Sequence, residues 1–171
     1  MKGAYVPVGH ISHMTHMPIL GQLSKEIVAN GLRRILDAKV KVVYHHAKFD
    51  MHITQSTLGI AIEPYFDTLP AGWLLNENES HGLKDMYHTY LDPTGEKAKF
   101  GDLFDGIPFT MVPLDVAYLY AGFDPIMTFE LYEFQKEFLD VTNSKCKKQK
   151  LQGVAHVFWD IEMPLIPVVW R

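Results

Sequence analysis

The stretch VKVVYHHAKFD, residues 40–50, changes from a β-branched apolar run to a histidine pair and then to an acid. Residues 40–44 predict a buried strand, and residues 47–58 predict a helix that ends at Gly59. Because ligand sites of open α/β sheets form where the strands end, Asp50 is a candidate ligand for a divalent cation. An acid in the first helical turn is also typical of a carboxylate that only stabilises its helix, and this segment alone does not decide between the two.

The rest of the chain alternates further strand and helix patterns, which indicates an α/β protein. The expected elements in the N-terminal half are an edge strand at 4–8, a helix that begins after Ser24, and helices at 68–76 and 82–91. Those that follow are a loop at 92–106, a long amphipathic helix over 116–138 that restarts at Pro125, a solvated linker at 145–150, and an apolar segment at 154–170 broken at Pro164 and Pro167.

The composition suits one globular domain of 171 residues, with 47% hydrophobic and 21% charged residues. A net charge of −4 does not indicate the basic face of a protein that coats duplex DNA non-specifically, although it leaves room for a local nucleic-acid cleft. The single cysteine, Cys146, excludes an intrachain disulfide and a cysteine-based zinc site, so a reducing compartment is expected. The longest apolar run, residues 163–170, is too short and too rich in proline to span a bilayer.

Two further groups of residues could carry chemistry. Tyr120 and Asp124 stand four residues apart, on one face of the predicted helix, where a phenol beside a carboxylate can orient a metal-held water. Asp124 followed by Pro125 also matches a helix start with an acid as N-cap, which is the alternative for this pair. The second group is His10, His13 and His16. We interpret them as loop histidines that bond to backbone or water rather than to zinc.

In this order along the chain, these segments resemble the 3′→5′ proofreading exonuclease domain of family A DNA polymerases. That domain is a ribonuclease-H-like member of the DEDD exonucleases, in their tyrosine-containing branch. The family's second motif, a polar residue and then an aromatic-Asp pair, reads His46 to Asp50, with His46 where asparagine is usual. Its third motif, Tyr, three residues and Asp, reads Tyr120 to Asp124. Four flanking segments also resemble this domain, namely residues 4–10, 66–68, 81–85 and 160–168. Within the family, the expected branch is that of the phage polymerases.

The resemblance implies hydrolysis of the 3′-terminal phosphodiester with two divalent ions, Mg²⁺ or Mn²⁺. It assigns direct ligation of the first metal to Asp124, a largely water-mediated contact with the second to Asp50, and orientation of the attacking water to Tyr120. The implied partners are the 3′ end of single-stranded DNA and the remainder of a DNA polymerase chain, with no membrane, in the cytoplasm of a bacterial or phage-infected cell. The residues implied to flank the terminal nucleotide are His45, His46 and Phe49.

The family's first motif, a strand-borne Asp-x-Glu, has no counterpart before the predicted strand at 4–8. Residues 160–162 read Asp-Ile-Glu, but they follow the third motif and match the junction to a polymerase domain. We therefore expect a ribonuclease-H-like fold that lacks its first two strands, with a partial exonuclease domain over 1–144 and a linker and junction over 145–171. The alternative function is a non-catalytic DNA-binding or structural piece of a family A polymerase.

Overall fold

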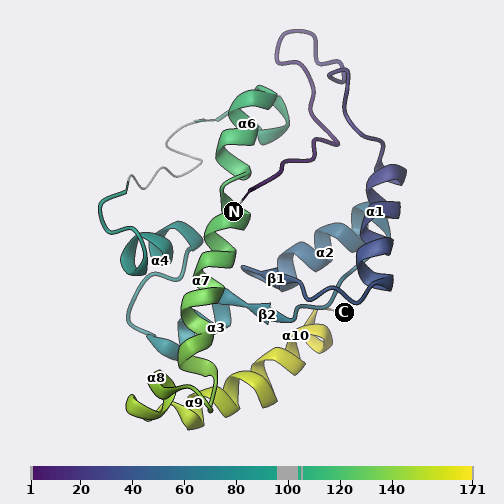
Figure 1. Cartoon of the computed structure of the whole chain (residues 1–171). Helices are drawn as coiled ribbons and strands as arrows, with labels where there is room; N and C mark the ends of the chain where they lie inside the picture. The colour runs from purple at the N-terminus through teal and green to yellow at the C-terminus, as the bar shows by residue number, and fades with distance from the viewer. Residues whose placement is uncertain (1, 96–103, 105, 171) are drawn as a thin grey trace.

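A computed structural model describes residues 2–95, 104 and 106–170 of the chain, and confirms a mixed helical and sheet architecture. Helix α7 runs through the molecule and contacts strand β1 as well as helices α3 and α4 (Figure 1). The elements are α1 (Lys25–Asp37), β1 (Val43–Tyr44), α2 (Ala47–Leu58), β2 (Phe66–Asp67), α3 (Thr68–Leu75), α4 (Leu83–Tyr90), η1 (Phe109–Met111), α6 (Leu114–Ala121), α7 (Asp124–Leu139), α8 (Ser144–Lys148), α9 (Gln152–Val157), the π-turn η2 (Phe158–Glu162) and α10 (Met163–Val169).

The two strands are parallel, and helix α2 forms the crossover between them. Val43 lies opposite Phe66 and Tyr44 opposite Asp67. A parallel pair needs a crossover of this kind, so both strands end on the same side, each directly before a helix. The start of α2 and the start of α3 therefore lie next to each other at the carboxyl edge of the sheet.

Asp67 holds these two helix starts together. Its Oδ1 accepts hydrogen bonds from the backbone N–H of His46 (2.9 Å) and of Leu69 (3.0 Å), and its Oδ2 accepts one from Ala47 (2.7 Å). The side chain is only 3% exposed. One buried carboxylate thus satisfies backbone donors at the N-termini of two helices, which otherwise have no partner within their own helix.

The main core lies between the sheet, α7 and the C-terminal helices. Phe66 packs against Phe158 with their ring centroids 4.8 Å apart, and Trp159 donates to the carbonyl of Leu139 (2.9 Å). The buried members of this core are Ala47, Met51, Phe66, Ala71, Leu139, Cys146, Ala155, Phe158, Met163 and Ile166. Helices α9, η2 and α10 cover one side of it (Figure 1).

This packing corrects two expectations for the C-terminal segment. Residues 144–148 form helix α8 rather than a solvated linker, because Cys146 is completely buried in the core while the lysines on the other face remain exposed. Pro164 and Pro167 do not break the following segment: Pro164 lies in the first turn of α10, and the π-turn before that helix is continuous with it. The division of the chain between residues 144 and 145 stays a prediction.

The expected strands are shorter than predicted or absent. Residues 4–8 form no strand, because the pairing partner that defines a strand is missing there; the carbonyl of Pro7 instead accepts from Leu23 (3.3 Å). Of the predicted strand 40–44, only Val43–Tyr44 pairs, and Val40 is 53% exposed. The other edge of this segment borders a cavity rather than a neighbouring strand.

Helix boundaries agree closely with the sequence. Ser24 caps α1 by accepting from Ile27 (3.3 Å), and α2 ends at Gly59, whose φ of 69° lies in the left-handed region. The helices at 68–76 and 82–91 are confirmed within one residue at each end. The predicted loop 92–106 lies partly outside the described residues.

The predicted restart at Pro125 is confirmed. Helix α6 ends at Ala121 and α7 begins at Asp124, with Pro125 in its first turn. Gly122 at the junction has no room for a side chain, because a Cβ there would lie 2.5 Å from the carbonyl oxygen of Tyr118. In the part of the chain that the structure describes, no helix is long and apolar enough to cross a membrane.

We predict that Asp67→Ala lowers the free energy of unfolding by about 2–4 kcal/mol, because it leaves three backbone donors without their acceptor in a buried site. Asp67→Asn should also destabilise, because its amide places an N–H against one of the same donors. Urea denaturation followed by circular dichroism measures both. Asp37→Ala, at the exposed end of α1, is the control, and equal midpoints for all variants would contradict this role of Asp67.

Candidate active site

A cavity of about 670 Å³ lies beside the unpaired edge of residues 40–45. Its other walls come from Ile35 of α1, from Asp50 of α2, from the first residue of α4, and from the N-terminal part of α7. Asp50 and Asp124, the acids of the predicted second and third motifs, both line this cavity. Segments that lie far apart in the sequence thus bring two carboxylates to one hollow in the molecule.

Asp50 is placed by the sharp turn between β1 and α2. His46 at this turn has a φ of 74°, in the left-handed region, and Asp67 holds its backbone N–H. The chain therefore enters α2 at once, and Asp50 lies in the first helical turn. Burial, followed by the nearby Asp67, raises the pKa of Asp50 to about 6, although His46 opposes the change. The site makes an ionised Asp50 costly in the absence of a cation.

Asp124 is the first residue of α7, and the N-cap position belongs to Phe123. The alternative in which Asp124 acts as the cap is therefore wrong. Its Oδ1 is buried and has no hydrogen-bond partner among the described residues. Burial raises the pKa of this carboxyl and Lys84 lowers it. A buried acceptor without a donor is an arrangement that a bound cation would relieve.

His45 also lines the cavity. Its Nδ1 lies 2.9 Å from the hydroxyl oxygen of Thr68, and that hydroxyl donates to the carbonyl of Tyr44 (3.2 Å). The hydroxyl must then accept from Nδ1–H, which leaves Nε2 as an acceptor. Burial, followed by the two neighbouring histidines His46 and His81, lowers the pKa of His45 to about 4. His45 is thus a neutral, oriented imidazole near pH 7.

His46 and Phe49 form an exposed aromatic pair outside the cavity lining. Their rings are stacked, with centroids 5.9 Å apart and planes at 21°. Phe49 is 58% exposed. An exposed planar pair of this kind can stack against a nucleic-acid base without selecting its sequence.

Tyr120 is the one predicted catalytic residue that is not among the described residues lining the cavity. Its ring lies near the rings of Phe104 (6.0 Å) and Phe109 (6.4 Å), and the ammonium of Lys84 lies 3.6 Å from its centroid. Tyr120 is therefore packed against α4 and η1, one helical turn away from Asp124.

The other acidic and histidine candidates lie elsewhere. Asp160 and Glu162 belong to the π-turn η2, not to a strand, and Asp160 pairs with His156 at 3.2 Å on the surface. His10 is buried and contacts the hydroxyl of Tyr5 and the carbonyl of Val112. The remaining loop histidines, His13 and His16, are exposed.

Within the described residues, no group of three or more His, Cys, Asp or Glu side chains could hold a metal ion. The two carboxylates at the cavity nevertheless fit a divalent cation, because the buried Oδ1 of Asp124 lacks a donor and burial disfavours both charges. The part of the chain that the structure describes thus brings two uncompensated carboxylates to one cavity but shows no complete cation site.

Three residues that support this site lie in the flanking segments 66–68 and 81–85, but none of them was given a role from the sequence. Asp67 caps both helices, Thr68 orients His45, and Lys84 lies beside both Tyr120 and Asp124. The signal for Asp67 was present in the sequence, because an aspartate directly before an apolar run is typical of the N-cap of a helix. Nothing in the local sequence around Thr68 or Lys84 indicates their distant partners.

Comparison with known proteins identifies a family and several relatives of the chain. A family model described as 3′-5′ exonuclease matches residues 4–139. DNA polymerase I of Pseudomonas aeruginosa is 28% identical over 99% of the chain, and DNA polymerase I of Treponema pallidum is 30% identical over 85%. The DNA polymerase of Escherichia phage T5 is 27% identical over 81%.

The matched region is a small part of each relative. The alignments cover 18%, 14% and 17% of these three proteins, so the chain spans less than a fifth of the curated relatives it matches. The family match covers more than half of the chain and includes both acidic segments at the cavity. The chain therefore belongs to the 3′-5′ exonuclease domain family of the family A DNA polymerases.

Proposed function

We propose that this chain forms the 3′→5′ exonuclease unit of a DNA polymerase and removes the 3′-terminal nucleotide of single-stranded DNA. The observation that carries the proposal is the convergence of Asp50 and Asp124, from the predicted second and third motifs, on one cavity. Membership in the exonuclease family and the polymerase relatives support the same substrate. The bacterial and phage origin of these relatives favours the cytoplasm as the location.

Asp124 and Asp50 are the residues that would hold two Mg²⁺ or Mn²⁺ ions. Such ions supply an activated water and stabilise the leaving oxygen of the scissile phosphodiester. Tyr120 orients the attacking water through its hydroxyl. His45, held neutral by Thr68, offers Nε2 as an acceptor to the terminal nucleotide, and His46 and Phe49 stack on its base.

Two carboxylates are too few to neutralise two adjacent divalent cations, which repel each other strongly. The unpaired edge of residues 40–45 and the cavity beside it offer room for a further strand. We infer that a strand carrying Asp-x-Glu, the family's first motif, occupies this position in the active unit. Residues 145–171 serve in this proposal as the junction to the polymerase.

A non-catalytic role is the second candidate. Only two carboxylates line the cavity among the described residues, whereas the exposed His46–Phe49 pair needs no metal to bind a base. A DNA-binding or structural piece of a polymerase would retain the aromatic pair without hydrolysing DNA. Hydrolysis assays separate the two functions.

We predict that the 171-residue chain alone does not hydrolyse single-stranded DNA, and that adding an Asp-x-Glu strand restores Mg²⁺- or Mn²⁺-dependent 3′→5′ hydrolysis. The strand is added either by fusion or as a separate peptide, and 5′-labelled DNA reports the direction of shortening. Restored activity should fall about a thousandfold in Asp124→Ala, because a metal contributes several kcal/mol to such a reaction. The strand should also raise the melting temperature.

The matched control for this assay is Asp115→Ala, which removes an exposed acid of α6. Failure of every Asp-x-Glu strand to restore activity, with DNA binding intact, would favour the non-catalytic role. Hydrolysis by the unsupplemented chain that is lost in Asp160→Ala would instead identify residues 160–162 as the first motif.

We predict that Asp50→Asn stabilises the metal-free chain near pH 7 but not near pH 4. The pKa of Asp50 rises from 3.8 to about 6 on folding, so between these values the folded chain binds more protons than the unfolded chain. Its contribution to stability therefore falls as the pH rises through this window. The asparagine variant avoids this loss and should melt a few degrees higher at pH 7, as measured by calorimetry in EDTA. The prediction would be contradicted if the melting temperature of Asp50→Asn exceeded that of the wild type by the same amount at every pH, or did not exceed it at pH 7.

A further inference from the structure

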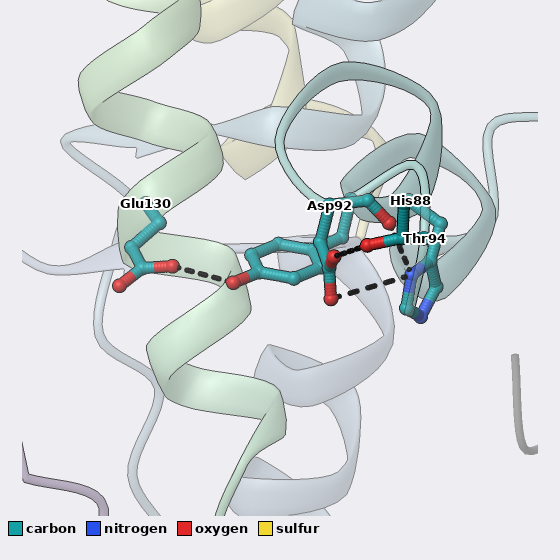
Figure 2. A network of polar contacts seen from close by, with 5 residues as sticks. His88, Asp92, Thr94 and Glu130 are labelled. Carbon is teal, nitrogen blue, oxygen red and sulfur yellow. Dashed lines mark hydrogen bonds and ion pairs between the residues drawn. The ribbon is translucent and has the colours of Figure 1, made fainter. Parts of the chain in front are cut away.

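Helix α4 is fixed against α7 on the side of the predicted third motif. The hydroxyl of Tyr87 donates to Oε2 of Glu130 at 2.8 Å, and this bond, followed by burial, raises the pKa of Tyr87 to about 12. Figure 2 shows Glu130 on α7 facing this network from the side opposite His88, Asp92 and Thr94. The ring of Tyr87 also lies 6.3 Å from that of Phe123.

The turn after α4 is held as well. Nδ1 of His88 bonds to the carbonyl of Asp92 at 2.9 Å, and the hydroxyl of Thr94 donates to the Asp92 carboxylate at 3.3 Å (Figure 2). His88 is 5% exposed. The middle of α4 and the turn after it are therefore tied down, and the contact of Tyr87 with Phe123 places the helix beside the junction of α6 and α7.

Lys84 lies in that first turn, three residues before Tyr87 and on the same face of the helix. Its Nζ lies 3.6 Å from the centroid of the Tyr120 ring, which is within the range of a cation–π contact. The same ammonium interacts with the Asp124 carboxylate and lowers its pKa. Leu83, the neighbour of Lys84, lines the cavity together with Asp124.

We propose that Lys84 is a positioning residue of the exonuclease site, because its ammonium lies on the ring of Tyr120 and its neighbour Leu83 lines the same cavity as Asp124. This inference rests on the proposed function, since it takes these two residues as the third motif. The ring contact holds the Tyr120 phenol in one orientation. The charge partly neutralises Asp124 when no divalent ion is bound.

The two effects of Lys84 act on catalysis in opposite directions. A fixed positive charge near Asp124 repels a second cation and weakens metal binding. The cation–π contact restricts Tyr120 and so favours a productive orientation of the attacking water. Loss of the ammonium should therefore tighten metal binding and at the same time release the tyrosine ring. A purely structural lysine would not separate these two properties.

The experiment uses the full chain and Mn²⁺ alone as the probe, with the ring of Tyr120 followed by NMR of ¹³C-labelled tyrosine. Paramagnetic broadening of signals near Asp124 gives the apparent dissociation constant. We expect Lys84→Met and Lys84→Gln to bind Mn²⁺ about threefold to tenfold more tightly, a range set by the modest energy of a partly exposed charge pair. The Tyr120 ring signal should shift and broaden in both variants, and Lys84→Arg should retain the wild-type values.

Two controls separate this inference from the proposed function. Lys25→Met removes an exposed ammonium at the start of α1 and should change neither property. Asp124→Asn should lose most of the Mn²⁺ binding. If Asp124 is required but Lys84→Met and Lys84→Gln leave both the affinity and the Tyr120 signal unchanged, the role of Lys84 is wrong and the proposed function stands. If Asp124→Asn binds Mn²⁺ as the wild type does, the proposed function itself fails, and the role of Lys84 fails with it.

Discussion

The carboxylate of Asp67 determines how the chain leaves both strands of the sheet. Its hydrogen bonds to the backbone of His46, Ala47 and Leu69 bring the start of α2 beside the start of α3. His46 can keep its left-handed backbone conformation because its N–H is held there. The tight turn that results places Asp50 at the cavity rather than further along a loop. Thr68, the residue after Asp67, orients His45 from the same corner. A single buried acid thus positions the carboxyl edge of the sheet, where the candidate site lies, without lining the cavity itself.

The two acids at the cavity differ from Asp67 in what surrounds them. Asp67 has backbone donors for both oxygens, which lower its pKa against the larger effect of burial, so that its pKa remains raised. Asp124 has a buried oxygen without a donor, and Asp50 lies where burial and a neighbouring acid oppose its charge. A fold selected for stability alone would supply donors to these groups or replace them. Their uncompensated state distinguishes these two acids from the structural acid Asp67 and is the feature on which the proposed cation binding rests.

Local patterns predicted most of the helices and the residues that meet at the cavity. The boundaries of α2 and the restart at Pro125 follow from Gly59 and from the proline itself, which act within a few residues. The edge strand at 4–8 and the linker at 145–150 were wrong, because strand formation needs a distant partner and Cys146 is buried by contacts from elsewhere. The same limit explains why the sequence did not indicate Lys84. Its contact with Tyr120 depends on where α4 lies in space relative to α6.

Helix α7 connects the core to the site. Asp124 stands at its first turn and Leu139, which is completely buried, at its last. Between them Gln135 donates to the carbonyl of Thr68 (3.1 Å), so α7 is also tied to the corner that orients His45. Helices α8 and α9 pack against the far end of α7 and cover the core that holds it. Because the C-terminal part of α7 is held firmly in the core, the position of the Asp124 carboxylate at the start of this rigid helix is fixed as well. The C-terminal helices therefore contribute to the geometry of Asp124 although none of their side chains lines the cavity in the described structure.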